Sequence, residues 1–315
     1  MKEASKELMD FRGIVLVISM GITAGTPLLF SSVGEILTEK SGVLNLGIEG
    51  FMLMGAMTGF MVSYQTGNKW TALFVVIGVC LVLGLILSFV LITLRANQIA
   101  AGIAFTIFCT GLSTILGKPF IGVVAPDIFK KLTFSGFDKF PLLQLLFKKD
   151  VLVFVAIALA IIAWIFVYKT KSGLQLRAAG DNPSALDSLG VNVILQRYIY
   201  TTLGSIFAGI GGAYLSLAYS PSWIEGMAAG RGWLTIALVN FALWNPLYAI
   251  GGAYLFGTFY ALSFHLEAMG IAIPSYFLRM LPYICPIIIL IISKIRNKRN
   301  YVPRYLCLPY IREAK

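Results

Sequence analysis

Two polar residues inside an otherwise apolar stretch, Asn45 and Glu49, are the first candidates for a chemical role. A carboxylate in such surroundings is costly unless it faces protein or water, so Glu49 needs a partner. The two residues are four positions apart and share one face if the segment is helical. They either line a path for a polar solute or hold packed helices together by hydrogen bonds, and the residues alone leave both readings open. Asn240 and Asn245 are weaker candidates for the same path.

Residues that carry covalent or metal chemistry are scarce. The single histidine, His265, cannot build a histidine-rich metal site or a histidine proton relay, and we predict no metal site. The string from Gly111 to Lys118 is similar to a phosphate-binding loop, but five residues instead of four separate its glycines, and Pro119 stands where Ser or Thr would bind magnesium. We predict no catalytic residue and no cofactor in this chain; if ATP drives it, another chain binds the ATP. The cysteines have no paired spacing and are interpreted as buried small hydrophobes: Cys80, Cys109, Cys285 and Cys307.

The segment 169–195 carries the clearest local signals of structure. Asn182 is a good helix N-cap, Pro183 is a good first helical residue, and Gly190 is placed to end the helix in the left-handed conformation. We expect a short helix at about 183–189 with a small apolar ridge. The ridge consists of Ala185, Leu186 and Leu189. Such a helix suits docking into a groove of a partner protein and equally suits lying on a lipid surface, and the residues alone favour neither.

The elements that position these residues follow from composition. The chain of 315 residues is 58% hydrophobic and only 12% charged, with a mean hydropathy of +0.84. A soluble domain has about 25% charged residues, so lipid must cover part of this apolar surface. The apolar residues come in runs of roughly 20, the length of a membrane-spanning helix, and they alternate too poorly for barrel strands. We predict an all-α fold, a single transmembrane helical bundle over residues 1–315 with about 8–10 spans.

Nine apolar segments support this prediction. The segment 231–244 is short and ends at Asn245-Pro246, so we interpret it as a half-helix or a re-entrant piece. Two glycines and a carboxylate are expected to break a helix near 45–50. The nine segments lie at 13–33, 42–63, 70–94, 98–117, 150–168, 196–219, 231–244, 247–265 and 274–293.

The net charge of +11 is distributed as in a membrane protein and does not predict nucleic-acid binding. Lys and Arg gather between apolar runs and in the tail 294–315, which the positive-inside rule assigns to the cytoplasm together with 169–195. The segment 118–149 resists this assignment, because it carries six lysines on the opposite side. Glu225 and Arg231 also lie on that side, where a plain surface role is favoured over a mutual ion pair or a contact with a binding protein.

Two patterns of small residues bear on helix packing. Gly204, Ala208 and Gly212 recur at four-residue spacing, which lets helix backbones approach closely in lipid. The pentapeptide Gly-Gly-Ala-Tyr-Leu occurs at 211–215 and again at 251–255, which is thin support for an internal duplication. We expect these glycines to serve ordinary close packing of helices.

Three blocks of the sequence resemble one family of membrane proteins. The run 39–50, Glu-Lys-Ser-Gly-Val-Leu-Asn-Leu-Gly-Ile-Glu-Gly, resembles the signature near the start of permeases for branched-chain amino acids, simple sugars and nucleosides. The run 173–186 resembles the cytoplasmic loop through which those permeases couple to their ATPase. The runs 231–238 and 244–247 resemble a third block of the nucleoside and simple-sugar branch. The blocks occur in the family's order and cover most of the chain between about residues 34 and 265.

The resemblance implies a permease subunit of an ATP-binding-cassette (ABC) importer, similar to type II importers, in a bacterial inner or plasma membrane. It implies cytoplasmic ATPase subunits, a second permease subunit that is identical or paralogous, and an extracytoplasmic solute-binding lipoprotein as partners. The favoured solute is a nucleoside or a simple sugar, ahead of a branched-chain amino acid. The alternative is a stand-alone secondary transporter or channel, which predicts ion-coupling carboxylates in the membrane, and Glu49 is nearly the only one.

The resemblance assigns ATPase coupling to one loop. The residues are Gly173, Leu176, Arg177, Gly180, Asn182, Pro183, Ala185, Leu186, Leu189 and Gly190. The third block departs from the family pattern, because the run 241–243 is apolar where many relatives carry a more polar or basic residue, so no contact is carried over there. The segment 118–149 matches no part of the family pattern.

Overall fold

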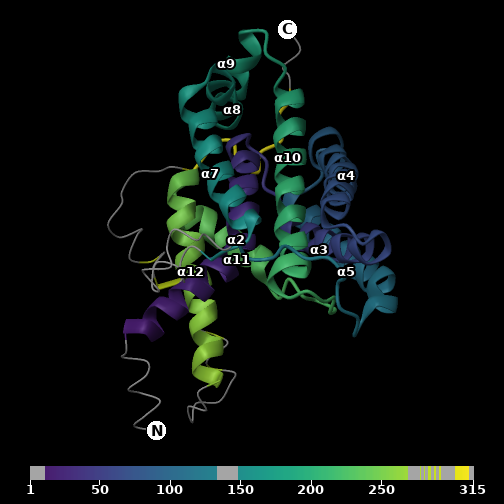
Figure 1. Cartoon of the computed structure of the whole chain (residues 1–315). Coiled ribbons are helices and arrows are strands. Elements are labelled where there is room, and N and C mark those ends of the chain that lie inside the picture. Colours follow the sequence, from purple (N-terminus) through teal and green to yellow (C-terminus); the bar gives the residue numbers. More distant parts are fainter. Residues whose placement is uncertain are drawn as a thin grey trace.

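The computed structural model describes residues 11–132, 148–268 and 302–311, together with scattered helical positions between 277 and 291. In this part of the chain helices are joined by turns and loops, and the only β pairing is two isolated bridges between 121–124 and 222–223. Two helices, α4 and α10, continue into π-helical turns at Phe89–Thr93 and Leu215–Tyr219. The helices, seen in Figure 1, are α2 (Phe11–Lys40), α3 (Ile48–Thr66), α4 (Lys69–Ser88), α5 (Gln98–Gly117), α7 (Val151–Lys169), α8 (Lys171–Asp181), α9 (Pro183–Ser188), α10 (Val193–Tyr214), α11 (Arg231–Phe241) and α12 (Pro246–Ala268).

Among the described residues, six helices are long and apolar enough to cross a membrane: α2, α4, α5, α7, α10 and α12. The predicted all-α transmembrane bundle is therefore confirmed. Three of the nine predicted segments are not in this set. Segment 42–63 becomes helical only at Ile48 and forms α3, which has 19 residues and is mostly buried. Segment 231–244 gives α11 with 11 residues, and segment 274–293 lies largely outside the described residues.

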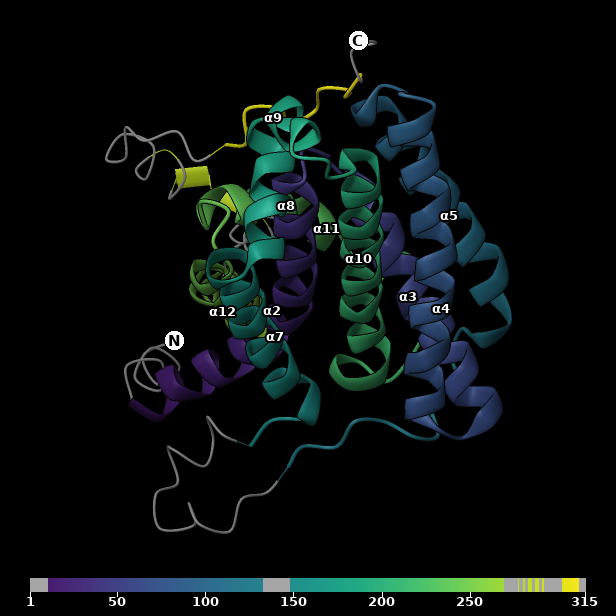
Figure 2. The same ribbon diagram turned by 90° about the horizontal axis from the view of Figure 1, so that it is seen from above.

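The helices α2 and α10 lie side by side at the centre of the bundle (Figure 2). Helices α3, α4 and α5 lie on the α10 side, and α7 and α12 lie on the α2 side. Of the six spans, α10 is the most buried, with 78% of its most apolar stretch inside the bundle, and α5 is the least buried, with 22%. The outer face of α5 is therefore left for lipid, whereas the polar residues discussed below gather around α2, α3 and α11.

Close packing at the centre depends on glycine. Gly204 of α10 lies against Thr38 of α2, and Gly212, two turns along the same helix, lies against the carbonyl of Met52 in α3. An added Cβ atom at either glycine would overlap its neighbour. In lipid there is little hydrophobic drive between helices, so small residues that permit close van der Waals contact stabilise the association. The close approach predicted for this row of small residues is confirmed, with two different partner helices.

The two ends of the bundle are built differently. One end, which we call the α9 end, carries α8, α9 and residues 302–311. The other, which we call the distal end, carries the turn between α3 and α4 together with residues 118–132 and 220–226. Because α2 begins at the distal end and finishes beside α8, it joins the two ends.

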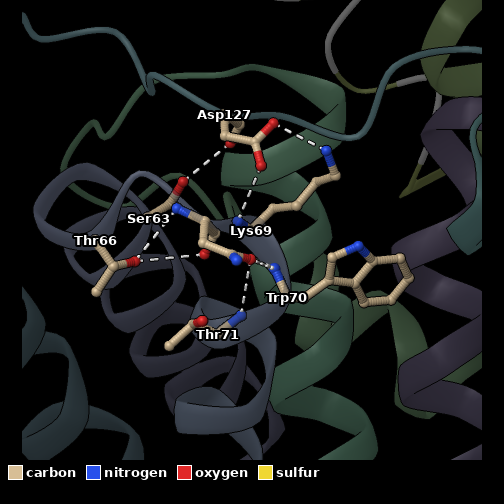
Figure 3. A network of polar contacts seen from close by, with 7 residues as sticks. Ser63, Thr66, Lys69, Trp70, Thr71 and Asp127 are labelled. Atoms are coloured by element: carbon tan, nitrogen blue, oxygen red, sulfur yellow. Dashed lines mark hydrogen bonds and ion pairs between the residues drawn. The ribbon is translucent and has the colours of Figure 1, made fainter.

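At the distal end, Asp127 joins the α3–α4 turn to the segment 118–132 (Figure 3). Its carboxylate accepts hydrogen bonds from Nζ of Lys69 at 2.9 Å and from the backbone N–H of Lys69 at 3.2 Å. Its carbonyl accepts from Oγ of Ser63 at 2.9 Å, while Asn68 caps the start of α4. The bond from the Lys69 ammonium holds the pKa of the Asp127 carboxyl below its usual range.

The six lysines of segment 118–149 do not all act as surface charges. Lys149 is 4% exposed, and its ammonium donates to the carbonyl of Ser19 and, at 2.7 Å, to Oγ of Ser19 in α2. Burial, together with the nearby charge of Lys131, lowers the pKa of Lys149 to about 8. Lys149 therefore joins α2 to the segment before α7. Lys139 lies outside the described residues, and the exposed members are Lys118, Lys130, Lys131 and Lys148.

The repeated pentapeptide occupies α10 and α12, and its glycines have different surroundings, which predicts different responses to substitution. Gly212→Ala places a methyl group on the Met52 carbonyl and should destabilise the protein by about 1–3 kcal/mol, as overpacking does. Gly251→Ala meets no atom within 4 Å and should be neutral, or should stabilise by up to ~1 kcal/mol through helix propensity. Thermal unfolding of the detergent-solubilised variants measures the difference, and equal melting temperatures would contradict the packing described above.

Candidate functional site

The segment at the α9 end forms the short helix that its sequence predicts. Oδ1 of Asn182 accepts the backbone N–H of Ala185 at 3.1 Å, which caps α9. Pro183 is the first helical residue, and Gly190 follows the helix with a φ of 79°. The helix covers Pro183–Ser188, so its cap, its first residue and its left-handed stop all lie where the sequence signals place them.

The neighbouring helix α8 is fixed to the transmembrane helices along one side. Leu176 is fully buried in a cluster with side chains of α2, α7 and α10. Gly173 and Gly180 lie so close to the backbones of α7 and α2 that neither position leaves space for a Cβ atom. The Arg177 guanidinium lies 5.5 Å from the ring centroid of Tyr168. Four of the residues predicted for coupling therefore hold the segment in place.

The apolar residues of α9 divide into an inward and an outward set. Leu186 is 2% exposed and packs against Ala179 of α8 and the start of α10. Ala185 is exposed, and Leu189 is 82% exposed. The expected ridge of three residues is not formed, because Leu186 faces inward while Ala185 and Leu189, which are one helical turn apart, face outward. The outward set that a partner can reach is Ala185 and Leu189.

Residues 302–311 lie along the same end and complete this surface. The backbone N–H of Tyr305 donates to the carbonyl of Gly180 at 2.8 Å, and Nη1 of Arg197 in α10 donates to the carbonyl of Leu308 at 3.0 Å. Tyr310 packs on the cluster around Leu186. A pocket of about 280 Å³ lies between this segment and the turn after α9 and is lined by Asp187, Gly190, Val191, Asn192, Val193, Ile194 and Tyr310.

Inside the bundle, Glu49 caps the start of α11 from the first turn of α3. Its Oε1 accepts the backbone N–H of Gly230 at 2.8 Å, and its Oε2 accepts the N–H of Gly232 at 2.6 Å. The first N–H groups of a helix have no partner within the helix, and the helix dipole favours an anion beside them. Glu49 is 9% exposed, so these bonds are shielded from water. The carboxylate therefore joins α3 to α11.

Arg231, the first residue of α11, lies between two tyrosine rings. Its guanidinium carbon is 4.3 Å from the ring centroid of Tyr260 and 5.6 Å from that of Tyr219. Its Nη1 donates to two backbone carbonyls of the preceding turn, each at 3.1 Å. Glu225 is exposed and forms no ion pair with Arg231 among the described residues. The tyrosines come from two other helical segments, so no local spacing in the sequence indicates this arrangement.

The three asparagines predicted for a path form local hydrogen bonds. Oδ1 of Asn45 accepts the backbone N–H of Gly47 at 2.8 Å in the turn before α3. Asn45 therefore lies outside the helix and does not share a helical face with Glu49, as the four-residue spacing had suggested. Asn240 is exposed and donates to a carbonyl one turn back at 3.1 Å. Asn245 accepts an N–H at 3.0 Å at the start of α12.

Two further carboxyl groups lie near the end of α2, on Glu35 and Glu39, and each residue is 1% exposed. Oε2 of Glu39 accepts from Nε1 of Trp244 at 2.5 Å, and Oε1 of Glu35 accepts from the backbone N–H of Asn45 at 3.0 Å. The span predicted at 13–33 excluded both residues from the membrane, although their spacing of four within an apolar segment was an available signal. Within the described part of the chain, no group of three or more His, Cys, Asp or Glu side chains is arranged to hold a metal ion.

Comparison with known proteins agrees with this architecture. The family described as branched-chain amino acid transport system / permease component matches residues 17–292. A Haloferax volcanii protein with the provisional name of a glucose ABC transporter permease, TsgC13, is 38% identical over 264 residues, which cover 82% of this chain and 79% of that protein. No solved structure matches the chain.

Two bacterial relatives cover still more of the chain. The guanosine ABC transporter permease NupQ of Bacillus subtilis is 30% identical over 87% of this chain and 91% of its own length. The nucleoside ABC transporter permease NupC of Lactococcus lactis is 32% identical over the same shares of 87% and 91%. Because the family match and these relatives extend over most of the helical bundle, the chain belongs to the branched-chain amino acid transport system permease family and is a transmembrane permease of the ABC-transporter type.

Proposed function

We propose that this chain is the permease subunit of an ABC importer that moves a nucleoside or a simple sugar into the cytoplasm, driven by ATP that a separate ATPase subunit binds. The relatives named for glucose, guanosine and nucleosides align with most of the chain, which supports this solute class over branched-chain amino acids. The observation that carries the coupling role is the division of the apolar side chains at α9 into a buried and an exposed set. Leu186 is buried and anchors α9 to the rest of the permease, while Leu189 is 82% exposed and available to a partner.

This protein spans the membrane several times, and the α9 end is proposed to face the cytoplasm. The exposed Lys171 of α8 and Arg304 of the C-terminal segment lie there, as the positive-inside rule requires. Since residues 302–311 bond to α8 and α10, the described C-terminal segment lies on this same side. The distal end, braced by Asp127 and Lys69, then faces the solute-binding lipoprotein.

Coupling is proposed to run from the ATPase through α9 into the centre of the bundle. Closure of the ATPase subunits displaces α9, and α8 transmits the displacement because Leu176 and Gly180 fix it to α2, α7 and α10. A helix packed this tightly moves as a rigid body and does not deform gradually. A second permease subunit, identical or paralogous, completes the path, which we place beside α11. Of the four polar residues predicted for the path, Glu49 acts by fixing the start of α11.

The first prediction concerns the contact with the ATPase. Leu189→Asp should leave the permease folded, because the side chain is 82% exposed, but it should place an unpaired carboxylate in the contact at a cost of about 2–4 kcal/mol. Co-purification of the ATPase and uptake of labelled nucleoside or sugar should both fall at least tenfold. The control is Leu174→Asp on α8, where the side chain is 59% exposed outside α9. A Leu189→Asp complex that stays intact and active would sink the coupling assignment.

The second prediction concerns orientation. A cysteine replacing the exposed Ser184 should react with a membrane-impermeant thiol reagent only from the cytoplasmic face. A cysteine replacing the exposed Lys130 at the distal end should react only from the outside. The background should carry Cys307→Ser, because that thiol is partly exposed at the α9 end. Labelling of the Ser184 position in intact cells would reverse the orientation proposed above.

The third prediction tests whether Glu49 acts by holding α11 or by touching the solute. Glu49→Gln keeps the shape but offers one acceptor oxygen to two backbone N–H groups, so one of these buried groups loses its partner. We expect a loss of about 1–3 kcal/mol of stability, seen as a lower melting temperature and lower abundance in the membrane. Glu225→Gln, at an exposed position, is the control. Normal abundance and melting with abolished uptake would instead show that Glu49 lines the path.

A further inference from the structure

The carboxyl groups of Glu35 and Glu39 form a buried pair where three segments meet. They are one turn apart on the same face of α2, and both residues are 1% exposed. The turn before α3 reaches Glu35 through Asn45, and the turn after α11 reaches Glu39 through Trp244. The four-residue spacing makes the two side chains neighbours on the surface of the helix.

The hydrogen bonds of this pair are incomplete without a further hydrogen atom. One oxygen of each carboxyl has a donor, but Oε2 of Glu35 and Oε1 of Glu39 have none. The side-chain nitrogen of Asn45, a fully buried residue, also has no partner, and it belongs to the residue whose backbone N–H holds Glu35. Buried polar atoms in a native protein are nearly always paired, so the unpaired oxygen on each of the two neighbouring carboxyl groups indicates a missing hydrogen-bond donor.

The charges on the surrounding elements do not neutralise the pair. Neither carboxyl has a cation within 4 Å among the described residues. Lys40, next along α2, lies over the ring of Tyr168 together with Arg177 of α8, and Arg197 of α10 donates to the carbonyl of Leu308. Glu49 of α3 is bonded to α11, and Asp181 of α8 lies near Lys40. Among the described residues, the thiol of Cys307 in the C-terminal segment also lies near the pair.

We propose that Glu35 and Glu39 form a proton-binding site, in which the two carboxyl groups hold one proton between them. Two ionised carboxylates in contact and out of water repel each other strongly, so such pairs share a proton. The shared proton is the missing hydrogen atom: a carboxyl O–H of one residue donates to the unpaired carboxylate oxygen of the other. The remaining single charge accepts the N–H groups of Trp244 and Asn45 and leaves an acceptor lone pair for the Asn45 amide.

Binding and release of this proton give two states to the junction of α2, the turn before α3 and the turn after α11, which we call the joint. With the proton bound, α2, the turn before α3 and the turn after α11 are connected by one continuous chain of hydrogen bonds. When the proton is lost, the carboxylates of Glu35 and Glu39 are two neighbouring negative charges out of water. Their repulsion then opposes the hydrogen bond from Trp244 to Glu39. The joint should therefore loosen as the proton leaves. This inference concerns contacts within the chain and depends neither on the solute nor on the ATPase.

Infrared difference spectroscopy of the purified permease in lipid tests the site directly. The wild type should show a carbonyl band of a protonated, buried carboxyl group at neutral pH. Glu35→Gln should remove it, because the glutamine N–H₂ replaces the shared proton as the donor to Glu39. Glu39→Gln should do the same, since its amide oxygen still accepts from Trp244. Two separately protonated acids would instead leave half of the band in each single variant.

Glu49→Gln is the matched control and should keep the band, because that carboxylate accepts two backbone N–H groups and needs no proton. Absence of the band from the wild type, or its survival in the Glu35→Gln, Glu39→Gln double variant, would overturn the proposal. Raising the pH should abolish the wild-type band and, in liposomes holding the complete importer, lower uptake over the same range. Uptake that does not change with pH, while the band titrates, would overturn the two-state joint. A complex with no uptake at all would count against the proposed function and not against the proton site.

Discussion

A helix that begins inside a membrane protein leaves its first backbone N–H groups without partners, and no water is present to supply them. The whole centre of this bundle depends on how α11 meets that requirement. Glu49 of α3 accepts the N–H groups of Gly230 and Gly232, and at the other end Trp244, with a φ of 55°, is held by Glu39 of α2. Both ends of α11 are therefore anchored to carboxyl groups of neighbouring helices, so α11 cannot shift without a rearrangement of α2 or α3.

The same end of α2 is where the proposed coupling segment, α8 and α9, touches the bundle. Gly180 of α8 packs against the carbonyl of Lys40, the residue that follows Glu39, and α2 extends from there to the distal end. A displacement of α8 thus reaches the anchor of α11 within one residue of α2. Along the rest of its length α2 contacts α10 and α12 through glycines that leave no space for adjustment, so a rigid-body shift is the motion that this packing permits.

Local signals predicted local structure well, and long-range contacts escaped them. Asn182, Pro183 and Gly190 specify α9 through groups within nine residues, so its bounds could be read directly from the sequence. The direction of Leu186 could not, because it depends on the cluster that this side chain shares with α8 and α10. The partners of Glu49 are 181 and 183 residues away along the chain. A periodic pattern of residues cannot predict a contact over such a separation. The carboxyl pair was missed for a third reason, namely that the predicted span stopped short of both residues.

The polar groups of this bundle form two kinds of connection between segments. Some have all their hydrogen bonds and a single arrangement, and one, the carboxyl pair of α2, can change its arrangement. At the distal end, the half-buried side chains of Asp127 and Lys69 satisfy each other, and Lys149 is satisfied by Ser19, so these connections have one arrangement. Along the helix interfaces, glycine packing needs no polar groups at all. The carboxyl pair of α2 is different, because apolar side chains of similar volume would fill its place without the cost of dehydrating two acids. A buried acid pair at the point where α2, α3 and α11 converge therefore adds little to stability, and what it adds is a second state.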